Sequence, residues 1–348
     1  MDFRLDDDQQ ALQTATREFC RKEITLDRVR RAFEGPDGDD ADLDRELASM
    51  GWIGITVPED RGGLGMGLVE QAVVCEELGY VNAPGGYFST ACLAIPVLLA
   101  LGADDLLEAL LDGSKRATVA MDHDIVVDAQ LADGFILESQ GRLAWYDRDE
   151  VDVTPHESLD GTRRTGSVRQ RGAGRELGPL EAVDDVIDGA TAVLCAEMVG
   201  GMQRVLDDTV AYVKDREQFA KPIGSFQAVQ HRCADMLVQT EGSRSATYYA
   251  AYANAYGEPD AAYASSVAKA YTSDASHFVT GEGIQLHGGI GFTWEHHMHF
   301  YFKRSTLNQV LLGDAAYHRE RALQLDPEAG IGAELDQRRE PVGADEHA

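Results

Sequence analysis

The sequence YVKDREQFAKPIGSFQAVQ, at residues 212–230, ends one long segment and opens another. Both segments repeat apolar residues at helical spacing, so residues 212–230 are predicted to hold the turn between two long helices. Arg216 and Lys221 lie in this turn, and Ser225 is predicted to cap the second helix. Cationic side chains beside the free N–H groups of a helix N-terminus attract anions. The turn is therefore a candidate anion site.

A second segment, IQLHGGIGFTWE at residues 284–295, follows the next helical pattern. Its glycines would let a ligand approach the main chain closely. Three histidines come directly after it, and His296 and His299 have the i, i+3 spacing that metal sites on helices use. Because histidines are common on helix surfaces, no metal site is predicted.

The C-terminal part, residues 186–325, is predicted to be a four-helix bundle. Four long apolar-patterned segments with short connections pack in this way. The fourth is interrupted at Gly313, and the remaining residues, 326–348, are predicted to form a flexible acidic tail. The predicted helices cover residues 188–213, 225–257, 259–288 and 295–325.

The first part, residues 1–113, is predicted to be an N-terminal helical domain. Residues 53–57 are predicted to be a short extended piece that runs into a flexible glycine-rich loop at 61–67. The glycine spacing matches neither of the common nucleotide-binding fingerprints. Helices are predicted over residues 5–23, 40–50, 68–78, 91–101 and 104–111.

Between the two helical parts, residues 114–185 are predicted to form a small β domain. Short β-rich pieces are separated there by Asp and Gly turns. The fold class is thus mostly α with a small β domain. The predicted strands cover residues 117–121, 134–137, 151–154 and 167–169.

The chain has 60 acidic and 31 basic residues, a net charge of -29. This charge repels phosphate backbones and anionic lipids, so nucleic-acid binding and a membrane-surface role are not expected. No apolar run approaches the roughly 20 residues that span a bilayer, and the acidic start of the chain does not resemble a signal peptide. Five scattered cysteines without C-x-x-C spacing are typical of reduced thiols. We therefore expect a cytoplasmic protein.

Together with the loop from Trp52 to Gly67, the two segments resemble the acyl-CoA dehydrogenase family of flavoproteins. The resemblance rests on R-x-x-F-x-x-P-I, then F-Q, and Q-x-x-G-G-x-G-F-T about 70 residues later. This family has an N-terminal helical domain, a middle β domain and a C-terminal four-helix bundle, so the resemblance covers almost the whole chain. Some pieces are similar to actinobacterial members that act on CoA thioesters of steroids and other bulky acids.

The resemblance implies FAD as cofactor, shared across a subunit interface. It assigns FAD contacts to Arg216 and Gln227, with Gln218 and Phe219 beside them. A diphosphate suits an arginine fork and backbone N–H donors. The resemblance also implies that one short segment receives the adenosine diphosphate half of FAD: Gln285, Leu286, His287, Gly288 and Gly289.

The family's catalytic base is missing from this sequence. In the family, a carboxylate removes the α proton of an acyl-CoA while the β hydrogen leaves as hydride. The two positions that carry this base in the family are occupied here by Leu312 and Ala190. Neither side chain accepts a proton, and Asp314 and Glu197 are the weak substitutes nearby.

The middle domain is also shortened compared with the family. Residues 127–133 and 158–164 resemble the second half of the family's β domain. Only residues 117–125 stand in place of the first half, which normally covers the flavin ring.

These departures leave three hypotheses. The first is a degenerate subunit of a heterotetrameric (α2β2) acyl-CoA dehydrogenase, whose longer homologous partner supplies the base. The second is a self-sufficient homo-oligomeric acyl-CoA dehydrogenase that uses Asp314 or Glu197 as base. The third is a non-catalytic helical-bundle protein that binds CoA thioesters or another protein. The acyl group and the electron acceptor stay open.

Overall fold

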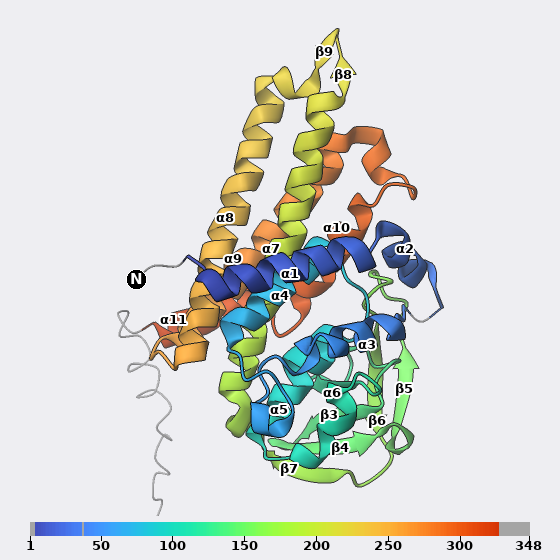
Figure 1. Ribbon diagram of the computed structural model, residues 1–348, viewed down its shortest axis with the longest axis vertical. Helices are drawn as coiled ribbons and strands as arrows, with labels where there is room; N and C mark the ends of the chain where they lie inside the picture. Colours follow the sequence, from blue (N-terminus) through green and yellow to red (C-terminus); the bar gives the residue numbers. More distant parts are fainter. Residues whose placement is uncertain (1–3, 37, 327–348) are drawn as a thin grey trace, which may run out of the picture.

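The computed structural model describes residues 4–36 and 38–326, and Figure 1 shows the course of the chain. The predicted tail therefore lies outside the described residues, except for Asp326. Within these residues, no helix is long and apolar enough to cross a membrane.

The N-terminal part is helical, as predicted. A capping box between Asp6 and Gln9 starts α1, and Thr25 caps α2. The helices are α1 (Asp7–Glu23), α2 (Leu26–Glu34), α3 (Ala41–Ser49), α4 (Leu68–Tyr80), a π-helix (Phe88–Ala94) that continues into α5 (Ile95–Ala100), and α6 (Glu108–Leu111).

The predicted extended piece at residues 53–57 is wrong, because the chain forms a 3₁₀ turn at Trp52–Gly54 instead. Five residues are too few to separate a strand from another buried apolar segment by periodicity. The glycine-rich loop that follows is tied back to this turn, since the N–H of Leu64 donates to the carbonyl of Gly54 at 3.1 Å. Gly62 and Gly65 have positive φ angles, 89° and 62°, which glycine adopts readily.

Two small sheets form the β domain. The first has the order β1-β3-β4-β7, in which β1 is parallel to β3 and the other pairs are antiparallel. The second has the order β2-β6-β5. The predicted strands correspond to β1, β3, β5 and β6. The bounds are β1 (Ala117–Ala120), β2 (Val126–Val127), β3 (Gly134–Ser139), β4 (Arg142–Asp147), β5 (Val151–Pro155), β6 (Thr165–Gln170) and β7 (Arg175–Pro179).

The C-terminal part is the predicted bundle. A β-hairpin, β8 (Glu217–Gln218) and β9 (Lys221–Pro222), joins the first two helices at the tip that projects upward in Figure 1. The fourth segment is broken at residues 311–314, as its glycine indicated. The helices are α7 (Asp184–Asp215), α8 (Gln227–Tyr256), α9 (Ala261–His287), α10 (Met298–Val310) and α11 (Ala315–Leu325).

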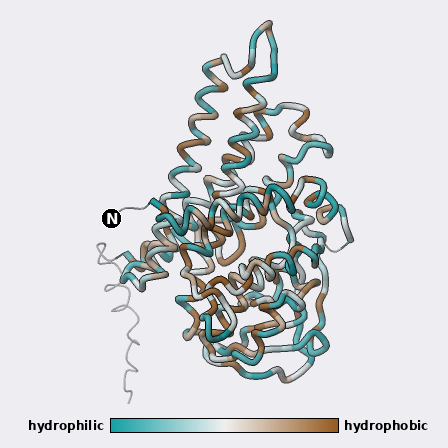
Figure 2. The backbone as a smooth tube through the Cα atoms, viewed as in Figure 1, coloured by the Kyte–Doolittle hydropathy of each residue, from teal (hydrophilic) through white to brown (hydrophobic). Residues whose placement is uncertain are grey.

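The helical parts share one core. Helix α4 lies so close to α7 that a Cβ atom on Gly200 would come within 1.9 Å of the carbonyl oxygen of Glu76. The largest apolar cluster extends from α4, the π-helix and α5 into the first half of α7. In Figure 2, hydrophobic segments are frequent in this lower body of the molecule. The tip of the bundle is therefore continuous with a closely packed core.

Candidate functional site

The hairpin at the bundle tip exposes an aromatic ring on a strained turn. Pairing of Gln218 with Lys221 leaves Phe219 and Ala220 as the turn, with φ angles of 54° and 62°. Positive φ at both positions is the pattern of a type I′ turn, which normally selects Asn and Gly. Non-glycine residues held there cost about 1–3 kcal/mol each. The Phe219 side chain is nevertheless 87% exposed. The turn therefore holds this ring at the surface at a cost in folding stability.

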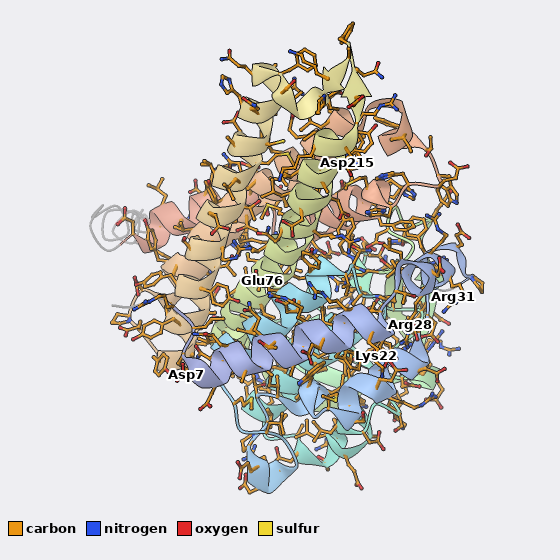
Figure 3. The ribbon with its side chains drawn as sticks, turned by 45° about the horizontal axis from the view of Figure 1, so that its top comes forward. Asp7, Lys22, Arg28, Arg31, Glu76 and Asp215 are labelled. Carbon is orange, nitrogen blue, oxygen red and sulfur yellow. The ribbon has the colours of Figure 1, made fainter. Side chains whose placement is uncertain are left out.

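Three cations gather at the same tip. Lys214, Arg216 and Lys221 form no ion pair with any described residue, whereas most arginines elsewhere in the chain are paired with a carboxylate. Figure 3 labels Asp215, the last residue of α7, which separates the first two cations in the sequence. In a chain with a net charge of -29, unpaired cations at one end are a candidate anion site, although the exposed Asp215 and Glu217 lie beside them.

The start of α8 adds free backbone donors. The predicted cap at Ser225 is wrong: its hydroxyl donates to the carbonyl of Pro222 at 2.7 Å, and Phe226 stands at the N-cap without a capping side chain. The N–H groups of a helix's first turn have no partner inside the helix. The exposed Gln227 is the first residue of α8, so its backbone N–H is one of these free donors.

The second segment lies beside the first. The ring of His287, at the end of α9, stacks on Tyr212, one turn before Arg216, with 4.4 Å between ring centroids. Gly288 and Gly289 are exposed, and a Cβ atom built on either would meet nothing within 4 Å. The two motifs predicted to share one ligand thus reach the surface at the same end of the bundle.

His287 itself lies inside the protein. It is only 4% exposed, and its Nδ1 is 2.7 Å from the carbonyl oxygen of Gly283, to which it donates as a neutral ring. Burial lowers the pKa of His287, which keeps the ring neutral. Of the five residues assigned to this segment, Gln285, Gly288 and Gly289 are exposed and Leu286 is half-buried. His287 therefore holds the segment in place from beneath.

The three following histidines have other partners. His297 is 2.6 Å from Asp208 and stacks on His296, and His299 stacks on Trp294. Burial, and next the neighbouring His297, lowers the pKa of His296 to about 4. In the described part of the chain, no group of three His, Cys, Asp or Glu side chains could hold a metal ion.

The two family base positions are apolar parts of the core. Ala190 is buried, and Leu312, with φ of 58°, packs against the same cluster. The Nζ of the fully buried Lys269 holds the turn around Leu312 by donating to the carbonyls of Gln309 (3.0 Å) and Gly313 (2.8 Å). Lys269 thus ties together the turn in which Leu312 lies.

The two substitute carboxylates already have structural roles. Asp314 caps α11 by accepting from the N–H of Tyr317 at 2.8 Å. Glu197 accepts from Arg163 at 2.6 and 2.9 Å and from Arg304 at 3.0 Å. Burial by itself raises the pKa of Glu197, but the charges of the two arginines outweigh burial and lower the pKa to about 2.

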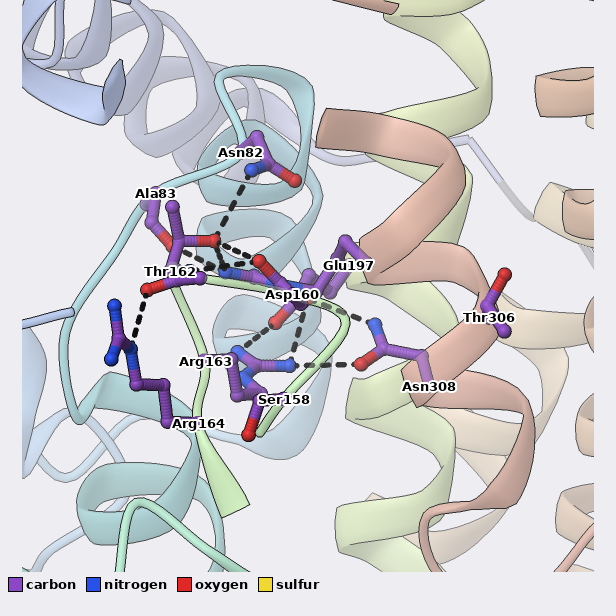
Figure 4. A network of polar contacts seen from close by, with 12 residues as sticks. Asn82, Ala83, Ser158, Asp160, Thr162, Arg163, Arg164, Glu197, Thr306 and Asn308 are labelled. Atoms are coloured by element: carbon purple, nitrogen blue, oxygen red, sulfur yellow. Dashed lines mark hydrogen bonds and ion pairs between the residues drawn. The ribbon is translucent and has the colours of Figure 1, made fainter. Parts of the chain in front are cut away.

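Glu197 belongs to a buried network that joins the three parts of the chain (Figure 4). Arg304 of α10 pairs with Asp160 of the β domain, donates to Thr162 at 2.7 Å and to the carbonyl of Ala83 at 3.2 Å. A cavity of about 10 Å³ borders Glu197 and Arg304, and such a volume holds at most one water. Glu197 thus has no room to meet a substrate there.

The sequence interpretation missed this network. The sequence DGTRR at residues 160–164 contains an arginine of this network, but such a polar stretch is typical of a loop. Arg304 follows Lys303 in FYFKR at 300–304, and nothing in this stretch distinguishes the buried cation from the one that is not. Only the three-dimensional packing shows that these side chains converge on Glu197.

Comparisons with known proteins agree with the fold. The family model for the acyl-CoA dehydrogenase N-terminal domain matches residues 6–114, and the model for the C-terminal domain matches residues 181–324. Acyl-CoA dehydrogenase IpdE2 of Mycolicibacterium smegmatis is 35% identical over 325 residues, 93% of this chain and 99% of the relative. Neither model covers the β domain between the two matches.

Two similar solved structures are each named for a pair of proteins. The "Tcur3481-Tcur3483 steroid ACAD G363A variant" has a TM-score of 0.86 and 29% identity, over 93% of this chain and 99% of that one. The ChsE4-ChsE5 complex from Mycobacterium tuberculosis has a TM-score of 0.85 and 26% identity, over 98% of this chain and 100% of that one.

Proposed function

Since the chain belongs to the acyl-CoA dehydrogenase family, we propose that it is one subunit of a heteromeric acyl-CoA dehydrogenase. In this proposal it supplies one wall of an FAD site, and a longer homologous chain supplies the rest. The observation that carries the proposal is the bundle tip, where unpaired cations, an exposed aromatic ring and open backbone lie together.

The residues of the tip suit the diphosphate and adenosine of FAD. Arg216 offers a guanidinium fork to phosphate oxygens, and Lys214 and Lys221 add charge. The open backbone at Gly288 and Gly289 accepts a flat ring or a phosphate at close range. Phe219 projects far enough to pack against a ligand or a partner surface. Bound FAD supplies the hydride-accepting ring for the α,β-dehydrogenation of an acyl-CoA.

The proton acceptor is assigned to the partner chain. Leu312 and Ala190 are apolar, and Glu197 is held ionised between two arginines with no space beside it. A carboxylate whose pKa is lowered to about 2 is a poor proton acceptor at neutral pH. The two similar structures are each named for a pair of proteins, and this supports a paired assembly. One of them names a steroid enzyme, so we propose a bulky ring-containing acyl-CoA as substrate.

The second candidate function is a self-sufficient enzyme, and one observation favours it. Asp314 is exposed and lies two residues after the family base position, in the turn that Lys269 holds. Its carboxylate accepts only one backbone N–H among the described contacts. The Asp314→Ala variant tests this version, because unchanged turnover would exclude Asp314 as the base.

The main test is co-expression of this chain with a longer acyl-CoA dehydrogenase homologue from the same genome. We expect the isolated chain to be colourless and the purified pair to show flavin absorbance and oxidise steroid-type acyl-CoA with a dye as electron acceptor. Stoichiometric FAD on the isolated chain, together with acyl-CoA oxidation, would contradict the proposal. A colourless pair that still binds acyl-CoA would favour a non-catalytic binding protein.

A further inference from the structure

The glycine-containing segment at residues 288–295 is anchored at only a few points. Gly288 and Gly289 are open to solvent, and Ile290 and Phe292 are 48% and 81% exposed. At its start, the buried His287 fixes the backbone through Gly283 and Tyr212. The exposed side chains of Ile290 and Phe292 therefore do little to hold the middle of the segment.

The other end of the segment is held by helix α2 from the N-terminal part of the chain. The guanidinium of Arg30 donates to the carbonyl of Trp294 and to the carbonyl of Glu295, each at 2.8 Å. These bonds span 264 and 265 residues of sequence. Two adjacent carbonyls outside a helix need donors, and a planar guanidinium can serve both at once. A lysine ammonium cannot match this fork geometry.

Further contacts hold Trp294 and Arg30 in place between α2 and α10. The indole N–H of Trp294 donates to Glu34 of α2 at 2.9 Å, and its ring lies 5.6 Å from Phe33. Arg30 also lies over the ring of Phe300 at 5.2 Å. Helix α2 thus contacts the loop through Arg30, Phe33 and Glu34, and of these Arg30 binds its main chain.

We propose that Arg30 is a positioning residue for the nucleotide-binding segment, a role that rests on the function proposed above. Arg30 holds the C-terminal end of the segment while His287 holds its N-terminal end. The backbone between them then faces FAD in one conformation before binding. Preorganisation of this kind raises affinity because less conformational entropy is lost on binding.

The test compares Arg30→Ala, Arg30→Lys and Arg31→Ala in the co-expressed pair. Arg31 is the matched control: it is the next residue of α2, it is exposed, and its side chain forms no ion pair or hydrogen bond among the described residues. Two measurements are made, the dissociation constant of FAD by flavin fluorescence and hydrogen exchange of the amides of residues 288–295. The melting temperature of each variant reports general damage.

We expect Arg30→Ala to speed exchange within residues 288–295 and to weaken FAD binding about tenfold, the effect of freeing about one residue of backbone. Arg30→Lys should recover part of the affinity, and Arg31→Ala should match the wild type. Wild-type FAD affinity in Arg30→Ala would overturn the positioning role and leave the proposed function intact. A wild-type pair that binds no FAD would instead overturn the proposed function, and the positioning role with it.

Discussion

Lys269 is a fully buried lysine that forms no ion pair with any described residue. Its ammonium is satisfied by two carbonyls of the turn before α11 and by the hydroxyl of Ser273 at 3.2 Å. Burial lowers the pKa of Lys269 to about 8. Above that pH the folded protein loses a proton that the unfolded chain keeps up to a pKa near 10.4. The folding free energy therefore becomes more favourable as the pH rises from 8 toward 10.

The Lys269→Met variant should lack this rise. Between pH 8 and about pH 9.5, the wild type should gain about 1–2 kcal/mol in unfolding free energy relative to the variant. Urea unfolding at both pH values measures the difference. Lys214→Met, which changes an exposed lysine without an ion pair, should keep the wild-type slope. An equal slope in wild type and Lys269→Met would show that the buried ammonium keeps an ordinary pKa.

At the scale of elements, the guanidinium of Arg304 connects α10 to α7 and to the β domain. Arg304→Met leaves the buried Asp160 without an ion-pair partner among the described residues, and Glu197 keeps only Arg163. Breaking a buried pair in this way costs about 3–5 kcal/mol, whereas Arg319→Met removes an exposed pair with Asp274 worth about 1 kcal/mol or less. Urea unfolding at pH 7 compares the two variants.

The pH dependence gives this prediction a second readout. Because the pKa of Glu197 is lowered from 4.5, its ion pairs stabilise the fold fully above pH 4.5. That stabilisation is lost as the pH falls toward 2. The difference between wild type and Arg304→Met should therefore shrink in acid. A loss below about 1 kcal/mol at pH 7 would mean that the network contributes no more than a surface pair.

The elements also show where sequence patterns work. Long helices were predicted well, because 25 or more residues average out local noise in the 3.6-residue period. Strand β4, RLAWYD at 142–147, was missed although Gly141 stands directly before it as a turn residue with a positive φ of 77°. The cap at Ser225 is wrong for another reason, since a motif names a residue but not the direction of its side chain. The same limit hid the partners of Glu197.

At the scale of the whole molecule, the net charge of -29 acts against the ligand proposed for the tip. FAD carries a diphosphate, so the long-range field of the chain repels it while the unpaired cations near Arg216 attract it locally. Salt screens the distant charges most, because the Debye length falls from about 10 Å at 0.1 M to about 3 Å at 1 M. The composition fixes the total charge, but only the pairing seen in the structure tells which cations are free to bind.

Arg216→Ala in the assembled pair should therefore weaken FAD binding more at about 0.1 M salt than at about 1 M salt. Without the local cation, the repulsive field of the chain acts on the diphosphate unopposed, and screening then removes much of that repulsion. Flavin fluorescence titrations at both salt concentrations measure the dissociation constants. Arg319→Ala, at the other end of the bundle on α11, changes the net charge equally and serves as control (Figure 1). If both variants lose the same affinity, the tip acts through net charge alone and Arg216 is no specific phosphate ligand.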